Sequence, residues 1–182
     1  MTNYDCGMRS LVAAVAADLI SEEPAADQAT ALAAFAPLIG SWDLRYVYRP
    51  ASGEHVAGTG YAHFGWGLGG QAIVDIWGFE NSVVGTTIRF YDATAGCFRS
   101  TWICPARNAL IAFVGRAVEG RIILNARAND PPGRRIRWSF TAIESQRFFW
   151  TGEISDDAGS TWLLNQEIEG KRRVGQATEG GA

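Results

Sequence analysis

GSWDLRYVY, at residues 40–48, is the stretch where the chain changes from a helical pattern to a strand pattern. Successive side chains of a strand point to opposite faces, so an inward Trp42 places Leu44, Tyr46 and Tyr48 on the same inner face. The charged residues between them then face water. This alternation predicts a half-buried strand that carries two phenol groups on its inner side.

The same alternation continues to the end of the chain and is interrupted by Gly, Asp, Asn and Pro, which favour turns. We predict ten strands, at 41–49, 54–66, 71–79, 83–92, 97–104, 109–117, 120–127, 134–142, 146–154 and 161–169. Most of the links are too short for the crossovers that parallel strands need. We therefore expect a mainly β fold in which about 8 to 10 antiparallel strands close into a barrel, because closure removes unpaired strand edges.

Two Ala-rich helices are predicted before the barrel, at 9–20 and 27–38. The second helix has apolar residues at three- and four-residue spacing, so one of its faces should lie on a hydrophobic surface. We expect a helical extension over 1–38, a barrel over 39–173 and a flexible tail over 174–182. The extension is either a lid over the barrel mouth or a dimer arm, so a homodimer is possible.

The motif Gly40-Ser41-Trp42, directly after a predicted helix, resembles the Gly-x-Trp signature of lipocalins and their relatives. Residues 149–173 and the turn at 90–96 are similar to a family of bacterial lipocalin-like domains of unknown function. The resemblance implies a lipocalin-like barrel whose first-strand Trp closes one end beneath a basic residue, either Arg172 or Arg173. Such a fold serves both carriers and enzymes, so the resemblance implies architecture rather than activity.

Composition and charge exclude several kinds of partner. The 182 residues carry a formal charge of −3 and no large basic cluster, so nucleic acid is not an expected partner. No apolar run approaches the roughly 20 residues that span a bilayer, so no membrane partner is expected. The apolar residues 11–17 are followed at once by Asp18, unlike an export signal, and we expect a cytoplasmic protein.

The sequence predicts neither a metal nor a cofactor. His55 and His63 are the only histidines, and at about 3.3 Å per residue along one strand they would lie near 26 Å apart. The Gly-rich stretch at 65–70 opens no predicted helix, so it lacks the amide groups that hold a phosphate. Its expected role is a tight turn.

Asp75 is the unusual polar residue, because it lies within the apolar segment 73–77, IVDIW. If it shares the cavity face with Trp77, loss of water would favour its neutral form and make it a candidate general acid or base. On this view Asp75→Asn would abolish activity at an unchanged melting temperature. His63 in the preceding strand and the phenol of Tyr46 are the other candidate catalytic groups. For Asp75 and His63, an outward, purely solvated position is the alternative.

An aromatic interior is the remaining signal, because the chain has seven Trp, five Tyr and nine Phe. The candidate ligand-binding residues are Tyr48, Trp66, Trp77, Phe79, Tyr91, Trp102 and Trp150. The charged side chains of later strands, Arg89 among them, are expected in water. These residues suit a small, largely apolar or aromatic molecule, held for metal-free acid/base chemistry of the cyclisation, isomerisation or elimination type. The alternative is a binding or carrier protein without catalysis.

Overall fold

The computed structural model describes residues 13–16, 18–50, 53–80, 82–127 and 133–173. Its elements are β1 (Ile20–Ser21), α2 (Ala29–Leu32), the 3-10 helix η1 (Ala33–Leu38), β2 (Gly40–Tyr48), β3 (Val56–Gly67), β4 (Ala72–Phe79), β5 (Ser82–Asp92), β6 (Cys97–Cys104), the 3-10 helix η2 (Pro105–Arg107), β7 (Ala109–Val118), β8 (Arg121–Ala126), β9 (Arg135–Ile143), β10 (Arg147–Ser155) and β11 (Leu163–Arg172). Among these described residues no helix is long and apolar enough to span a bilayer.

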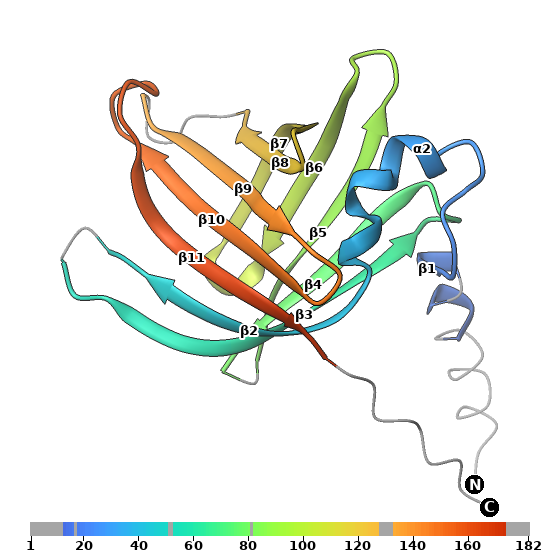
Figure 1. The fold of residues 1–182 in the computed structure, drawn as a ribbon, viewed down its shortest axis with the longest axis horizontal. Coiled ribbons are helices and arrows are strands. Elements are labelled where there is room, and N and C mark those ends of the chain that lie inside the picture. The colour runs from blue at the N-terminus through green and yellow to red at the C-terminus, as the bar shows by residue number, and fades with distance from the viewer. Residues whose placement is uncertain (1–12, 17, 51–52, 81, 128–132, 174–182) are drawn as a thin grey trace, which may run out of the picture.

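Strands β2 to β11 form a closed antiparallel barrel (Figure 1). From β2 to β11 each strand pairs with the next strand in the chain, including β3 with β4. The last strand, β11, pairs with β2, so the ring is closed. The fold is a lipocalin-like barrel, as predicted, and the ten predicted strands match the observed ones to within a few residues. The two-residue strand β1, which was not predicted, pairs with the end of β3.

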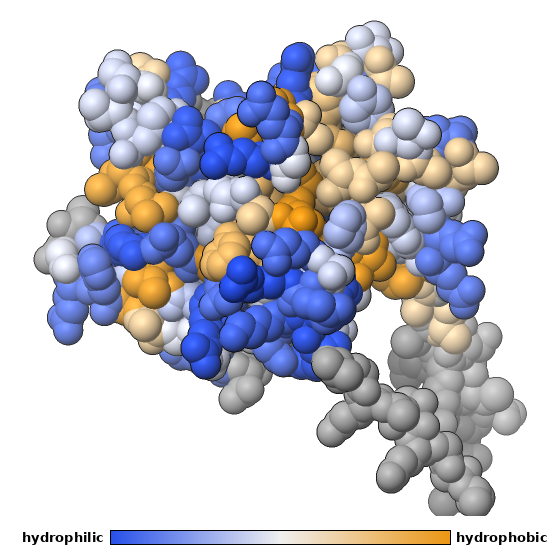
Figure 2. Space-filling model, viewed as in Figure 1, coloured by the Kyte–Doolittle hydropathy of each residue, from blue (hydrophilic) through white to orange (hydrophobic). Residues whose placement is uncertain are grey.

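The alternation of β2 explains which side chains form the core. Trp42 and Leu44 are buried, whereas Asp43 and Arg45, which alternate with them, are exposed. Inner side chains of nine strands form one buried hydrophobic cluster, and Tyr91 of β5 packs against it. The outer wall carries most of the charged side chains, and hydrophilic residues gather over the middle and lower part of the face drawn in Figure 2, where β10, β11 and β2 run.

The N-terminal segment is less regular than predicted. Residues 13–16 and 18–19 are helical, whereas 9–12 and 17 lie outside the described residues, as does the tail over 174–182. The second predicted helix is one α-helical turn followed by the 3-10 helix η1, which contains Pro37. Proline has no N–H to donate and its ring crowds the preceding turn, so a regular α-helix does not continue through this position.

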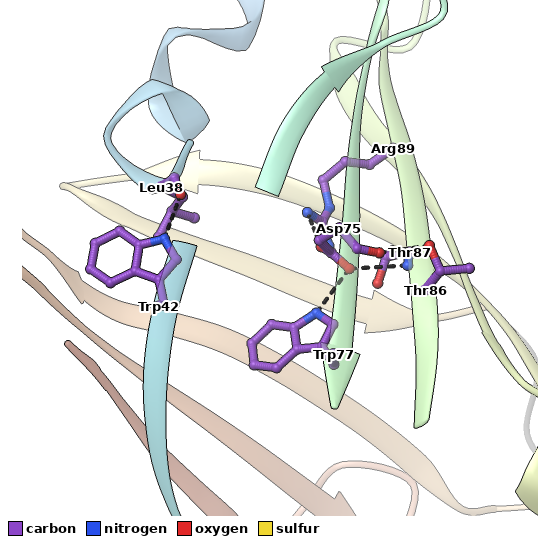
Figure 3. A network of polar contacts seen from close by, with 7 residues as sticks. All are labelled: Leu38, Trp42, Asp75, Trp77, Thr86, Thr87 and Arg89. Carbon is purple, nitrogen blue, oxygen red and sulfur yellow. Dashed lines mark hydrogen bonds and ion pairs between the residues drawn. The ribbon is translucent and has the colours of Figure 1, made fainter. Parts of the chain in front are cut away.

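The helical segment α2–η1 closes one end of the barrel (Figure 1). Leu32, Phe35 and Leu38 are fully buried, and the Phe35 ring meets Phe98 at 4.9 Å edge to face. Trp42 donates its indole N–H to the carbonyl of Leu38 at 2.7 Å (Figure 3). The predicted apolar stripe is therefore confirmed.

Candidate functional site: an aromatic cavity with a buried ion pair

A cavity of about 350 Å³ lies inside the barrel. Its walls come from the ends of β2, β4 and β6 and from the starts of β3, β5 and β11, so it lies at the end of the barrel opposite to α2–η1. The exposed side chains of Tyr48, Val56 and Arg107 stand at its rim. Eight aromatic side chains line it: Tyr46, Tyr48, Trp77, Phe79, Trp102, Trp138, Phe140 and Trp150.

Four tryptophans make one wall of this cavity. Trp138 meets Trp102 at 5.8 Å and Trp150 at 5.4 Å between ring centroids, both edge to face. Trp150 in turn lies 6.3 Å from Trp77. Rings in these arrangements attract one another beyond their simple burial, so the wall is stiff and apolar.

Glycines in the strands leave room for two of the aromatic rings that line the cavity to lie against the backbone. A Cβ atom on Gly85 would come within 2.6 Å of Trp102, and one on Gly58 would come within 2.6 Å of the Tyr46 hydroxyl. Real Cβ atoms essentially never come so close to another atom. The width of the cavity therefore depends on these two positions.

Asp75 and Arg89 form a buried ion pair in the barrel interior (Figure 3). Arg89 Nη1 lies 2.6 Å from Asp75 Oδ2, and the two side chains are 3% and 0% exposed. The other carboxylate oxygen accepts hydrogen bonds from the indole N–H of Trp77 at 2.8 Å and from the backbone N–H of Thr87 at 3.0 Å. Both oxygens of Asp75 are thus engaged.

The guanidinium of Arg89 is less completely engaged. Its Nε and Nη1 atoms and Asp75 Oδ2 have no hydrogen-bond partner among the described residues, so the contact between the two side chains is an ion pair without the alignment of a hydrogen bond. One face of the guanidinium lies 5.0 Å from the centre of the Phe35 ring. A buried donor without a partner costs about 1–3 kcal/mol.

Polar groups also stand at the mouth of the cavity. The Tyr46 hydroxyl donates a hydrogen bond to Glu80 Oε1 at 3.3 Å. The pKa of Tyr46 is raised, first by burial and then by the negative charge of Glu80 and this hydrogen bond. Arg107 opposes the increase in pKa by a smaller amount. The phenol is therefore held in its protonated, hydrogen-donating form.

The structure places most of the predicted site residues around one space. Tyr46 and five of the seven candidate binding residues line the cavity: Tyr48, Trp77, Phe79, Trp102 and Trp150. Asp75 lies in the interior, which is one of the two positions that the sequence left open, but Trp77, Thr87 and Arg89 stand between it and the cavity.

Two predicted binding residues belong to the closed end of the barrel. Trp66 is buried beside β1, at the pairing of Ser21 with β3. The ring of Tyr91 packs edge to face on Phe98, 5.4 Å away, next to the helical segment. Neither lines the cavity.

His63 requires a correction. It is exposed on the outer wall, where Nδ1 shares a hydrogen bond of 2.8 Å with the Ser41 hydroxyl. Its neighbour Phe64 is the residue opposite Asp75, so strand alternation points His63 and Asp75 to opposite sides of the wall. The two residues therefore form no proton-transfer pair. Partial burial and the charge of Arg173 lower the pKa of His63.

Arg89 also requires a correction, since it was expected in water and is only 2% exposed. It lies on the same face of β5 as Thr87 and Tyr91, and Asp75 lies directly opposite Thr87. A carboxylate inside an apolar strand needs a buried cation nearby, and this requirement was the available signal. Glu80, Gln166 and Trp138 also line the cavity without having been named as site residues.

Comparisons with known proteins identify a fold but no family. No family model matches the chain, and no curated protein matches it. Among solved structures, Rv2717c from M. tuberculosis has a TM-score of 0.55 at 14% identity, over 84% of this chain and 100% of that chain. The S-type phycobiliprotein lyase CPES from Guillardia theta has a TM-score of 0.53 at 11% identity, over 78% and 92% of the two chains. This chain shares their fold.

Proposed function

We propose that this protein binds a small, largely apolar or aromatic molecule in the barrel cavity. The observation that carries the proposal is the cavity of about 350 Å³ with eight aromatic side chains on its walls. Binding sites for small molecules are concave, mostly apolar and furnished with a few polar groups, and their volumes begin near 300 Å³. The size, the aromatic lining and the two polar positions at Arg89 and Tyr46 support this function.

The experiment uses N-phenyl-1-naphthylamine, a neutral aromatic probe whose emission rises in apolar surroundings. We expect saturable binding with energy transfer from the tryptophans of the cavity wall. Gln166→Trp fills the cavity from β11 and should abolish binding, whereas Glu167→Trp, its neighbour on the outer wall, should leave binding unchanged. Equal binding by both variants would place the probe elsewhere and contradict the proposal.

A second candidate function is proton transfer on the bound molecule, and the contact between Tyr46 and Glu80 at the mouth favours it. Here Glu80 is the proton acceptor and the Tyr46 phenol is the donor. Asp75 is not proposed as a base, since its carboxylate is paired with Arg89, accepts the hydrogen bond of the Trp77 indole and does not line the cavity. Its proposed role is to position Arg89.

The proton-transfer function can be tested with 5-nitrobenzisoxazole, a neutral bicyclic probe whose ring opens when a base removes one proton. We expect turnover that is lost in Glu80→Gln, while that variant still binds N-phenyl-1-naphthylamine. A wild-type rate equal to that of Glu80→Gln would remove catalysis by Glu80 and leave a binding protein.

A further inference from the structure

Arg89 is the buried donor of the cavity. It lines the cavity wall and its side chain is 3% exposed. Its Nε and Nη1 atoms are buried without a hydrogen-bond partner among the described residues, and Nη1 is also the atom that lies 2.6 Å from Asp75 Oδ2. Phe35 lies over the guanidinium from the closed end of the barrel, 5.0 Å from Cζ to the ring centre, so Arg89 stands at the inner end of the cavity. A ligand that reaches this depth meets a donor group in apolar surroundings.

The charge around this donor is already balanced. Asp75 lies 2.6 Å from Arg89, so the pair carries no net charge. At the mouth, Glu80 and Arg107 also have opposite signs. An anionic group placed beside Arg89 would be repelled by the carboxylate of Asp75, and this repulsion is strong where water is excluded. An uncharged acceptor can take a hydrogen bond from the guanidinium without that repulsion.

We propose that the ligand is an uncharged aromatic molecule with a carbonyl-type oxygen at its inner end, and that this oxygen accepts a hydrogen bond from Arg89. This inference rests on the proposed function, because it assumes that the cavity is a binding site. Asp75 is then a positioning residue that holds the guanidinium through an ion pair, while Trp77 and Thr87 hold the carboxylate. The aromatic walls supply affinity, and Arg89 supplies the orientation.

Three probes of nearly equal shape separate the possibilities. 2-Acetylnaphthalene has the carbonyl oxygen, 2-ethylnaphthalene lacks it, and 2-naphthoate carries a negative charge. We expect wild-type protein to bind 2-acetylnaphthalene about tenfold more tightly than 2-ethylnaphthalene, as one hydrogen bond to a charged donor allows. The carbonyl stretching frequency of the bound acetyl probe should fall, which reports the hydrogen bond directly and needs no variant.

The matched variants are two double substitutions. Asp75→Leu with Arg89→Met removes the buried pair together, so no unpaired charge remains, and it should make the acetyl and ethyl probes bind equally. Glu153→Leu with Arg137→Met removes an ion pair of the outer wall and should keep the preference. A preference that survives loss of the buried pair would overturn the inference.

The outcomes also distinguish this inference from the proposed function. Equal binding of the acetyl and ethyl probes by wild-type protein would overturn the inference and leave the cavity as a binding site. Tighter binding of 2-naphthoate than of 2-acetylnaphthalene would also overturn it, because the ligand class would then be anionic. Binding of none of the three probes would contradict the proposed function itself.

Discussion

The guanidinium of Arg172 lies over the indole ring of Trp42, 4.2 Å from Cζ to the ring centre. These residues face each other where β11 pairs with β2, and of the two arginines implied by the resemblance it is Arg172 that takes this place. Arg172 also donates to the carbonyls of Pro37 at 2.6 Å, Ile39 at 2.8 Å and Ser145 at 2.5 Å. One side chain therefore joins the helical segment, strand β2 and strand β11.

Arg172→Met should destabilise the protein strongly. It removes a charged donor from three backbone carbonyls and a cation from the face of Trp42, and we expect a loss of about 3 kcal/mol in the free energy of unfolding. Arg173→Met is the control, because Arg173 pairs with Asp43 on the surface and should cost less than about 1 kcal/mol. Urea unfolding measures the loss of unfolding free energy in both variants. Equal losses would show that Arg172 does not join the three elements.

Asp75→Asn should also be strongly destabilising, in contrast to the unchanged melting temperature that the sequence suggested. It leaves the charge of Arg89 buried without a counter-ion, which costs about 3–5 kcal/mol. Replacing both members by Asp75→Leu with Arg89→Met should recover most of that loss. Thermal and urea unfolding test this prediction. If the Asp75→Asn variant is as stable as wild type, the charge of Arg89 must be balanced by a group other than Asp75.

Asp157 should keep its charge far into acid. Its carboxylate accepts hydrogen bonds from the Thr161 hydroxyl at 2.6 Å, the Thr161 backbone N–H at 2.8 Å and the Ser155 hydroxyl at 2.7 Å, which hold its pKa well below the ordinary range. The lower folded-state pKa stabilises the protein above the unfolded pKa, near 3.9, and this stabilisation is lost as the pH falls toward the folded value.

The side chain of Thr161 allows a matched test of this loop. Thr161→Val removes the hydroxyl and should raise the pKa of Asp157, whereas Thr161→Ser keeps the hydroxyl and should not. The carboxyl carbon shift of Asp157, followed by NMR from neutral to acid pH, gives the pKa directly. An identical titration in both variants would show that the Thr161 hydroxyl does not hold the charge.

The barrel could be predicted from sequence because its strands alternate and its turns are short. Both features are local, and the nine residues of β2 are enough to show the alternation. The interior of β5 could not be predicted in the same way. Its apolar Phe90 is 50% exposed and its charged Arg89 is buried, so alternation alone gives the reverse orientation.

The orientation of β5 is decided by a contact between strands. Asp75 on β4 lies opposite Thr87 on β5, and its buried charge requires a cation on the same inner face. Sequence patterns carry no register between strands, so Asp75 was recognised as unusual while its partner was not. For the same reason His63 was paired with Asp75 although the two residues point to opposite sides of the wall.

The titration of Tyr46 tests the polar group at the cavity mouth. Burial is the largest cause of its raised pKa and the charge of Glu80 is the second, so Glu80→Gln should lower the pKa only part of the way to its ordinary value near 10. Glu169→Gln on the outer wall is the control and should leave it unchanged. The difference in ultraviolet absorbance between each protein and its Tyr46→Phe counterpart isolates this one phenol.

The sign of the effect on stability follows from the same shift in pKa. The unfolded chain loses the Tyr46 proton first as the pH rises, so the neutral phenol stabilises the fold at neutral pH and this contribution is lost through the alkaline range. Glu80→Gln should make that loss smaller. A pKa of Tyr46 that is identical in wild type and Glu80→Gln would show that the carboxylate does not act on the phenol, and it would remove the donor and acceptor pair on which proton transfer at the mouth depends.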